Sequence, residues 1–211
     1  MSTKDDISDD LAYVKALAEE GRDTPLVGGV MYVIWGGLIG AAALLVYAHA
    51  MGWISLGPMA GYAPWITASA IGWVLSLYLG RRTSRKPGAA TLGNKTATAV
   101  WFSVGIFITG FWIVLMVVHD NFQADGIPPY FLFGLMFPMF FGLYGVALYA
   151  TATAARATWL RWFAALSWIL SAVSMMLMAS PHQMLVAVIG CFIGVAAPGL
   201  MLMRNEPSEI V

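Results

Sequence analysis

Three histidines are the side chains of this sequence best suited to metal chemistry. His49, His119 and His182 each lie near the end of an apolar segment, on the side opposite most of the charges. Imidazole binds copper, zinc or haem iron, and thioethers bind Cu(I). Methionines are placed at the same level, at positions 51, 59, 116, 175, 176, 178 and 184. The spacing matches no known ligand motif, and gap-filling methionines explain it more simply. We therefore treat the histidines as weak candidates and expect no metal or other cofactor.

A second candidate site lies in an aromatic segment, about residues 129–152. Phe133, Phe137 and Phe141 recur along it, and Pro138 stands in its middle. Proline removes a backbone hydrogen bond, so this helix should bend, and Pro198 should bend the last segment likewise. A bent aromatic helix could line a pocket for a lipophilic molecule. The alternative is a structural kink with ordinary lipid-facing phenylalanines.

Residues for catalysis or ion transport are missing from the apolar segments. No Asp, Glu or Lys lies within them, and Arg161 is close enough to a segment end to reach the interface. Proton and ion pathways usually need intramembrane ionisable groups. Cys191 is the lone cysteine, and a buried thiol behaves as a small hydrophobic group. We predict that the protein is not an enzyme.

The elements that must position these residues are long apolar helices. Hydrophobic residues make up 60% of the chain and charged residues only 10%. A spanning helix needs roughly 20 apolar residues. Six apolar segments of 16 or more residues are the expected spans, at about 26–51, 64–79, 96–118, 129–152, 158–179 and 183–203. The sequence predicts an all-α polytopic membrane protein, with six transmembrane helices bundled as three hairpins. Residues 1–25 and 205–211 would lie outside this domain of residues 26–204.

The distribution of basic residues predicts the orientation. All 11 Lys and Arg fall on one side of the expected membrane domain, five of them in the loop 81–95. By the positive-inside rule, this loop and both termini are cytoplasmic. We expect a multi-pass protein of the plasma membrane, most simply a prokaryotic inner membrane. The formal net charge is zero, which argues against a nucleic-acid partner.

The N-terminal segment, residues 1–25, predicts a short amphipathic helix with an apolar stripe at Leu11, Val14 and Leu17. The segment carries seven acidic and three basic residues, whereas the loop 81–95 carries five basic and no acidic residues. We expect the helix to dock on Arg81, Arg82 and Arg85, or to exchange that contact for a partner.

These features favour a non-enzymatic regulatory or scaffold protein, which presents a cytoplasmic docking helix to a cytosolic or membrane protein or to a second copy. The alternative is a small transporter or solute-binding membrane subunit for an apolar or neutral ligand.

Overall fold

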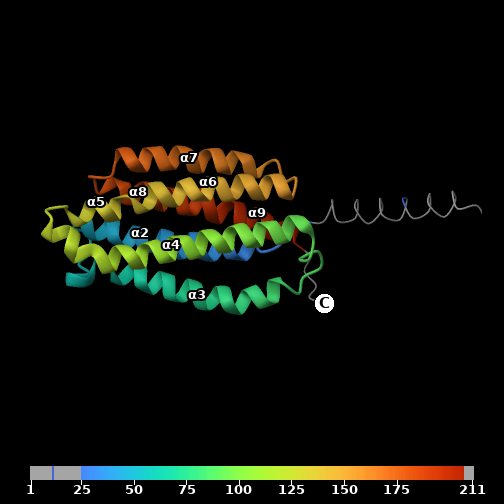
Figure 1. Ribbon diagram of the computed structural model, residues 1–211, viewed down its shortest axis with the longest axis horizontal. Helices are drawn as coiled ribbons and strands as arrows, with labels where there is room; N and C mark the ends of the chain where they lie inside the picture. The colour runs from blue at the N-terminus through green and yellow to red at the C-terminus, as the bar shows by residue number, and fades with distance from the viewer. Residues whose placement is uncertain (1–10, 12–24, 207–211) are drawn as a thin grey trace, which may run out of the picture.

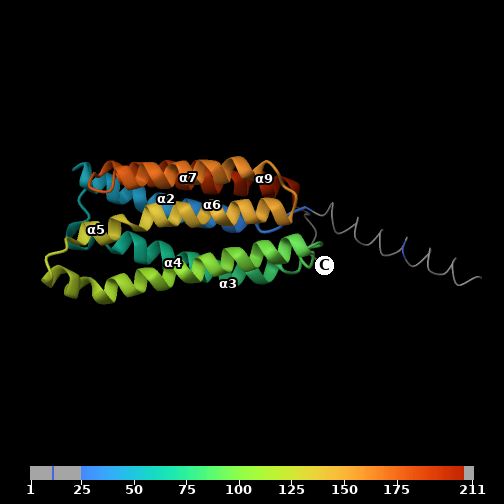
Figure 2. The ribbon, with the colours of Figure 1, turned by 45° about the horizontal axis from the view of Figure 1, so that its top comes forward.

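The fold is a bundle of helices, seen in a computed structural model that describes Leu11 and residues 25–206 (Figure 1). Within these residues there is no β-strand. The helices are α2 (Gly29–Ala50), η1 (Gly57–Met59, a 3₁₀ turn), α3 (Ala63–Thr83), α4 (Leu92–Ala124), α5 (Pro129–Gly134), α6 (Met136–Ala154), α7 (Leu160–Met176), α8 (His182–Ile189), η2 (Gly190–Ala196, a π-helix) and α9 (Ala197–Asn205). The turns 84–91 and 155–159 lie at the same end of the bundle as the start of α2 and the end of α9 (Figures 1 and 2). We call this end of the bundle the basic end.

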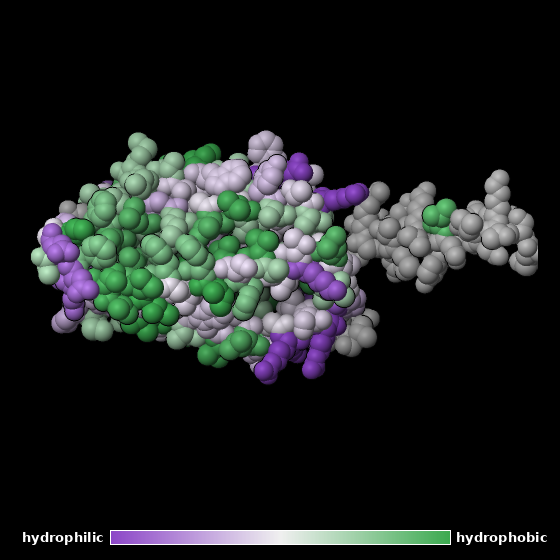
Figure 3. Space-filling view, viewed as in Figure 1, coloured by the Kyte–Doolittle hydropathy of each residue, from purple (hydrophilic) through white to green (hydrophobic). Residues whose placement is uncertain are grey.

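Five helical segments of the described chain are long and apolar enough to cross a membrane. They are Gly29–Ala50, Ala63–Thr83, Leu92–Ala124, Phe131–Ala154 and His182–Asn205. The segment expected at 158–179 forms α7, which has only 17 residues and is shorter than the others. On the face shown in Figure 3, apolar residues dominate the middle and polar residues gather at the two ends. Five of the six expected spans are thus long and apolar enough to cross a membrane, which indicates a multi-pass membrane protein.

The first helix packs against the last helical segments at glycines. A Cβ added to Gly36 would lie 2.7 Å from the Cys191 carbonyl oxygen, and one added to Gly29 would lie 2.5 Å from that of Gly199. Small residues let two membrane helices approach this closely. α2 thus contacts α8, η2 and α9 on one side and α3 on another. Gly36 and Gly40, which are four residues apart and so share a face of α2, both lie in this contact.

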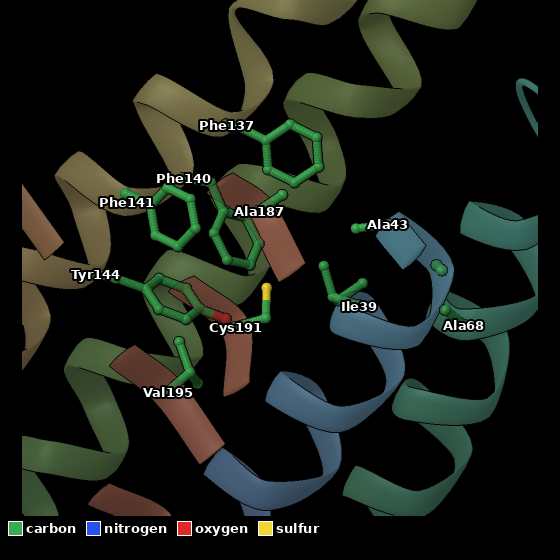
Figure 4. Packing of buried hydrophobic residues seen from close by; sticks show 11 residues of the cluster. Ile39, Ala43, Ala68, Phe137, Phe140, Phe141, Tyr144, Ala187, Cys191 and Val195 are labelled. Carbon is green, nitrogen blue, oxygen red and sulfur yellow. The ribbon is translucent and has the colours of Figure 1, made fainter. Parts of the chain in front are cut away.

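The core lies where α6 meets α2 and α8–η2 (Figure 4). Phe137, Phe140 and Tyr144 of α6 point towards these helices, and the Tyr144 hydroxyl points towards Cys191. The ring of Phe141 is fully buried beside Gly190, where an added Cβ would lie 2.4 Å from it. Extensive packing also joins α6 to α7, which belong to different expected hairpins. Packing therefore links neighbouring hairpins and does not isolate them.

The two prolines interrupt helices, as their chemistry requires, but not where a simple bend would fall. The aromatic segment expected to be one helix is divided at Leu135 into α5 and α6, three residues before Pro138. The carbonyl that Pro138 leaves without a helical donor is that of Gly134, one turn earlier. The π-helix η2 likewise lies just before Pro198. Disruption on the N-terminal side of proline explains both positions.

Two helices extend further than the apolar pattern indicates. α3 continues to Thr83, so Arg81 and Arg82 fall in its last turn, where positive charge is favoured by the helix dipole. α4 has 33 residues instead of the expected run from about 96 to 118. Its length is about 50 Å at 1.5 Å per residue, which exceeds the hydrocarbon thickness. Polar residues such as Asn121 therefore continue the helix beyond the expected membrane boundary.

Candidate functional site: an apolar cavity between the helices

A cavity of about 440 Å³ lies in the half of the bundle remote from the basic end. Its walls come from α2, α3, α4, the α5–α6 break, the turn before α8 and the start of α8. The lining residues are Trp35, Ile39, Gly61, Trp65, Ser69, Ile108, Thr109, Trp112, Ile113, Met116, Phe133, Gly134, Met136, Phe137, Phe140, Met178, Ala179, Ser180, Pro181, Gln183 and Met184. The volume falls within the range of about 300–1,000 Å³ that is typical of small-molecule sites.

The lining is aromatic, aliphatic and uncharged. Three tryptophans, three phenylalanines and four methionines contribute, whereas Asp, Glu, Lys, Arg and His do not occur among the lining residues. Methionine side chains are flexible and polarizable, and they suit surfaces that adapt to ligands of varied shape. Apart from the tryptophan indoles, hydrogen-bonding side chains come from Ser69, Thr109, Ser180 and Gln183. Such a site can hold an apolar molecule that carries no charge.

Aromatic contacts fix one wall of the cavity. The rings of Trp65 and Phe137 lie 5.5 Å apart between centroids, and those of Tyr62 and Phe133 lie 6.2 Å apart in an edge-on arrangement. Aromatic pairs at these distances add to the stability gained from burial. Phe140 stacks on Tyr144 at 4.2 Å and continues the aromatic packing away from the cavity. The wall is therefore held by α3 and the α5–α6 region together.

Gln183 is the buried polar anchor of the site. Its Nε2 donates hydrogen bonds to the carbonyl oxygens of Gly134 (2.7 Å) and Ser174 (3.0 Å). The Gly134 carbonyl lacks a helical donor because of Pro138. The Ser174 carbonyl lacks one because the Met178 amide donates to Met175. One side-chain amide thus satisfies two carbonyls that the helices leave unpaired, and it fixes the start of α8 against α5 and α7.

The four residues of the expected aromatic pocket take different positions. Phe133 and Phe137 line the cavity. Pro138 is buried but shapes the cavity only through the α5–α6 break. Phe141 packs into the core against Gly190 instead. The contributions of α2, α3 and α4, and of Gln183, were not foreseen.

The three histidines are held in separate local contacts. His49 Nδ1 lies 3.3 Å from the Ile54 carbonyl oxygen, and His182 Nδ1 lies 3.4 Å from the Tyr47 hydroxyl. His119 packs on Phe133, with 5.7 Å between ring centroids, and its buried Nδ1 has no hydrogen-bond partner in the structure. No three His, Cys, Asp or Glu side chains in the described residues converge so as to hold a metal ion. The structure does not bring the weak metal candidates together.

The basic end presents the residues expected to dock a partner. Arg81, Arg82 and Arg85 are exposed. Leu11 is also exposed, by 65%, whereas Val14 and Leu17 lie outside the described residues. The docking contact between them is therefore a prediction that these residues do not test.

A polar network closes the same end. Asn94 is buried, accepts a hydrogen bond from the Val27 amide (2.9 Å) and donates to the carbonyls of Pro25 and Gly88 (3.0 Å each). Glu206 accepts from the Gly29 amide (2.5 Å) and forms an ion pair with Lys86. These contacts join the start of α2 to the basic turn and to the end of α9.

No protein-family model, no curated protein and no solved structure matches this chain. The length and composition of its helices indicate a helical, multi-pass membrane protein, and an uncharged cavity lies between these helices.

Proposed function

We propose that this protein binds an uncharged, apolar molecule within the membrane, as a solute-binding subunit or a small transporter. The observation that carries the proposal is the cavity of about 440 Å³, whose lining has no ionisable side chain. We further propose a prokaryotic plasma membrane as its location, with the basic end in the cytoplasm, because basic loops are retained there.

The polarity of the lining supports a neutral ligand. A charged group bound there would lose its hydration and gain no compensating charge from the protein, which is costly in an apolar environment. A neutral ligand gives up little hydration and can hydrogen-bond to the Gln183 side-chain oxygen as an acceptor or to the Ser69 hydroxyl. No nucleophile with an adjacent base lines the cavity. Binding without chemical conversion is thus the activity that this site favours.

Photolabelling tests the proposal directly. Purified protein in lipid nanodiscs is irradiated with a diazirine-bearing long-chain alcohol, and in parallel with the matching carboxylic acid at neutral pH. We expect the alcohol to modify cavity residues such as Trp65 and Met116, and the unlabelled alcohol to compete. The charged acid should modify them far less.

Two matched variants of α3 control for general lipid contact. Ser69→Trp places an indole in the cavity, whereas Val74→Trp changes a side chain that is 67% exposed on the same helix. Labelling of the cavity should fall several-fold in Ser69→Trp and stay unchanged in Val74→Trp. Equal labelling by alcohol and acid, or equal labelling of both variants, would refute a neutral-ligand site.

A regulatory or scaffold role is the second candidate, and the basic end supports it. Arg81, Arg82 and Arg85 are exposed, while Glu206, the acidic side chain that the structure describes at this end, is already paired with Lys86. The three arginines are free to attract an acidic partner, and residues 1–25 are acidic. Exposed ion pairs contribute only about 0–1 kcal/mol each, so such docking would be weak and exchangeable.

Protease access tests the regulatory candidate. In inside-out vesicles, cleavage within residues 1–25 should be slow at low salt. It should be faster at high salt, or when Arg81, Arg82 and Arg85 are replaced by Ser. Fast cleavage under every condition would mean that the segment does not dock on the basic end.

A further inference from the structure

We propose that the cavity is filled sideways from the bilayer, between α3 and α4, so that its ligand is a lipophile dissolved in the membrane core. This inference rests on the proposed binding function and adds the source of the ligand and its route. The two helices follow each other in the chain, yet they are held to different parts of the bundle.

The seam between α3 and α4 is weakly packed. α3 packs extensively on α2, and α4 packs extensively on α6, whereas close backbone contact between α3 and α4 is sparse. Both helices also bury few of their residues within the described structure. Two helices that lean on different neighbours can separate without breaking the rest of the bundle.

The Trp73 side chain joins the two helices at the edge of the cavity that is closer to the basic end. Trp73 of α3 donates a hydrogen bond from Nε1 to the Thr109 hydroxyl of α4, at 3.2 Å. The Trp73 ring also lies against α4 at Gly105, where an added Cβ would be 3.8 Å from it. Thr109 lines the cavity, so this contact marks the edge of the cavity that is closer to the basic end.

Beyond this contact the cavity wall is also the outer surface of the protein. Ile113, one turn further along α4, lines the cavity and is 51% exposed. Ser69 of α3 also lines the cavity and is partly exposed. In a chain that crosses a membrane, an exposed apolar residue at this depth contacts lipid. The cavity therefore meets the hydrocarbon at the seam.

A second opening lies at the end of the bundle remote from the basic end. Gly61, Ala179 and Pro181 line the cavity there and are exposed. A water-soluble solute would use that route, which leads towards the aqueous phase. The seam is the favoured route because an apolar ligand is concentrated in the hydrocarbon. The cavity lining at the seam is also apolar, apart from the Ser69 and Thr109 hydroxyl groups.

A phospholipid with a diazirine at the end of its acyl chain tests the lateral route. Its charged headgroup holds it in the bilayer, so its tail reaches the cavity only through a seam. We expect adducts on Trp65 and Met116 in the wild-type protein in nanodiscs. Ile113→Trp should reduce them several-fold by filling the seam, whereas Val117→Trp, on an exposed part of the same helix, should not. Thr109→Val should increase them by removing the hydrogen bond to Trp73.

The outcomes separate the route from the binding function. Cavity adducts from a water-soluble diazirine but not from the phospholipid would overturn the lateral route in favour of the end opening. Absence of cavity adducts from both reagents would overturn it by showing a closed cavity. Cavity adducts from the phospholipid that an unlabelled neutral lipophile fails to displace would support the lateral route and refute the proposed binding function.

Discussion

Replacing Gln183 with Leu should destabilise the protein because it leaves two buried backbone carbonyls without a hydrogen-bond donor. The substitution keeps the side chain close to the same size but removes the donor to Gly134 and to Ser174. A buried acceptor left without a partner costs about 1–3 kcal/mol in water-soluble proteins. Membrane proteins show smaller hydrogen-bond energies, about 0.6 kcal/mol on average. For two acceptors, we therefore expect the free energy of unfolding to fall by about 1–6 kcal/mol.

A double-mutant cycle tests the pairing of Gln183 with the Gly134 carbonyl. Pro138→Ala restores the backbone N–H that can bond the Gly134 carbonyl within the helix. In that background, Gln183→Leu leaves only the Ser174 carbonyl unpaired, so its cost should fall to about half. The difference between the two costs is the coupling energy between the sites.

The measurement is reversible unfolding in mixed dodecyl sulfate micelles, followed by near-ultraviolet circular dichroism. Gln123→Leu, at an exposed position on α4, controls for the change from amide to hydrocarbon and should shift stability by no more than about 0.5 kcal/mol. An equal cost of Gln183→Leu with Pro138 and with Ala at position 138 would refute the pairing of this amide with the proline-freed carbonyl.

Three further predictions concern packing, the basic end and orientation. Gly36→Ala should lower the free energy of unfolding by about 1–3 kcal/mol through overpacking against Cys191; Gly37→Ala, which has open space, should not, and equal effects in the same unfolding assay would refute the close contact. Asn94→Ala should loosen the start of α2 and speed proteolysis near Pro25 relative to Asn121→Ala; unchanged cleavage would show that the network is dispensable. A reporter in the turn before Pro128 should be active only outside the cell, and one after Val211 only inside. Replacing the basic residues Arg81, Arg82, Arg85 and Lys86 with neutral residues should disturb this orientation. If the orientation is retained, other charges determine it.

The helices could be predicted because the membrane restricts the choices so strongly. An apolar run of about 20 residues can hardly be anything but a helix in lipid. The interruptions near Pro138 and Pro198 follow equally from the missing amide. The end of α4 could not be read from hydropathy, because a helix that leaves the membrane keeps its hydrogen bonds in polar sequence.

Only one wall of the cavity, in the aromatic segment, could be predicted from the sequence. Phe133 and Phe137 stand out in an aromatic segment, and Met116, Met178 and Met184 had been placed at one level of the bundle. Which helices face each other is a property of packing, so the contributions of Trp35 and Thr109 were out of reach. Gln183 and Asn94 lie at the edges of apolar segments, where a polar residue looks like an ordinary loop residue. A glutamine two residues after Pro181, at the start of an apolar run, was the available signal.

The contact between the first and last helices has a consequence for biosynthesis. The Gly29 amide donates a hydrogen bond to the carboxylate of Glu206, which lies 177 positions later in the chain, and the face of α2 around Gly36 is covered by η2. The ribosome delivers α2 long before η2 and α9 exist. During that interval the glycine face of α2 is open to other helices or to the insertion machinery. Completion of the bundle therefore waits for the synthesis of η2 and α9, and a nascent chain stalled before them would keep the glycine face of α2 uncovered.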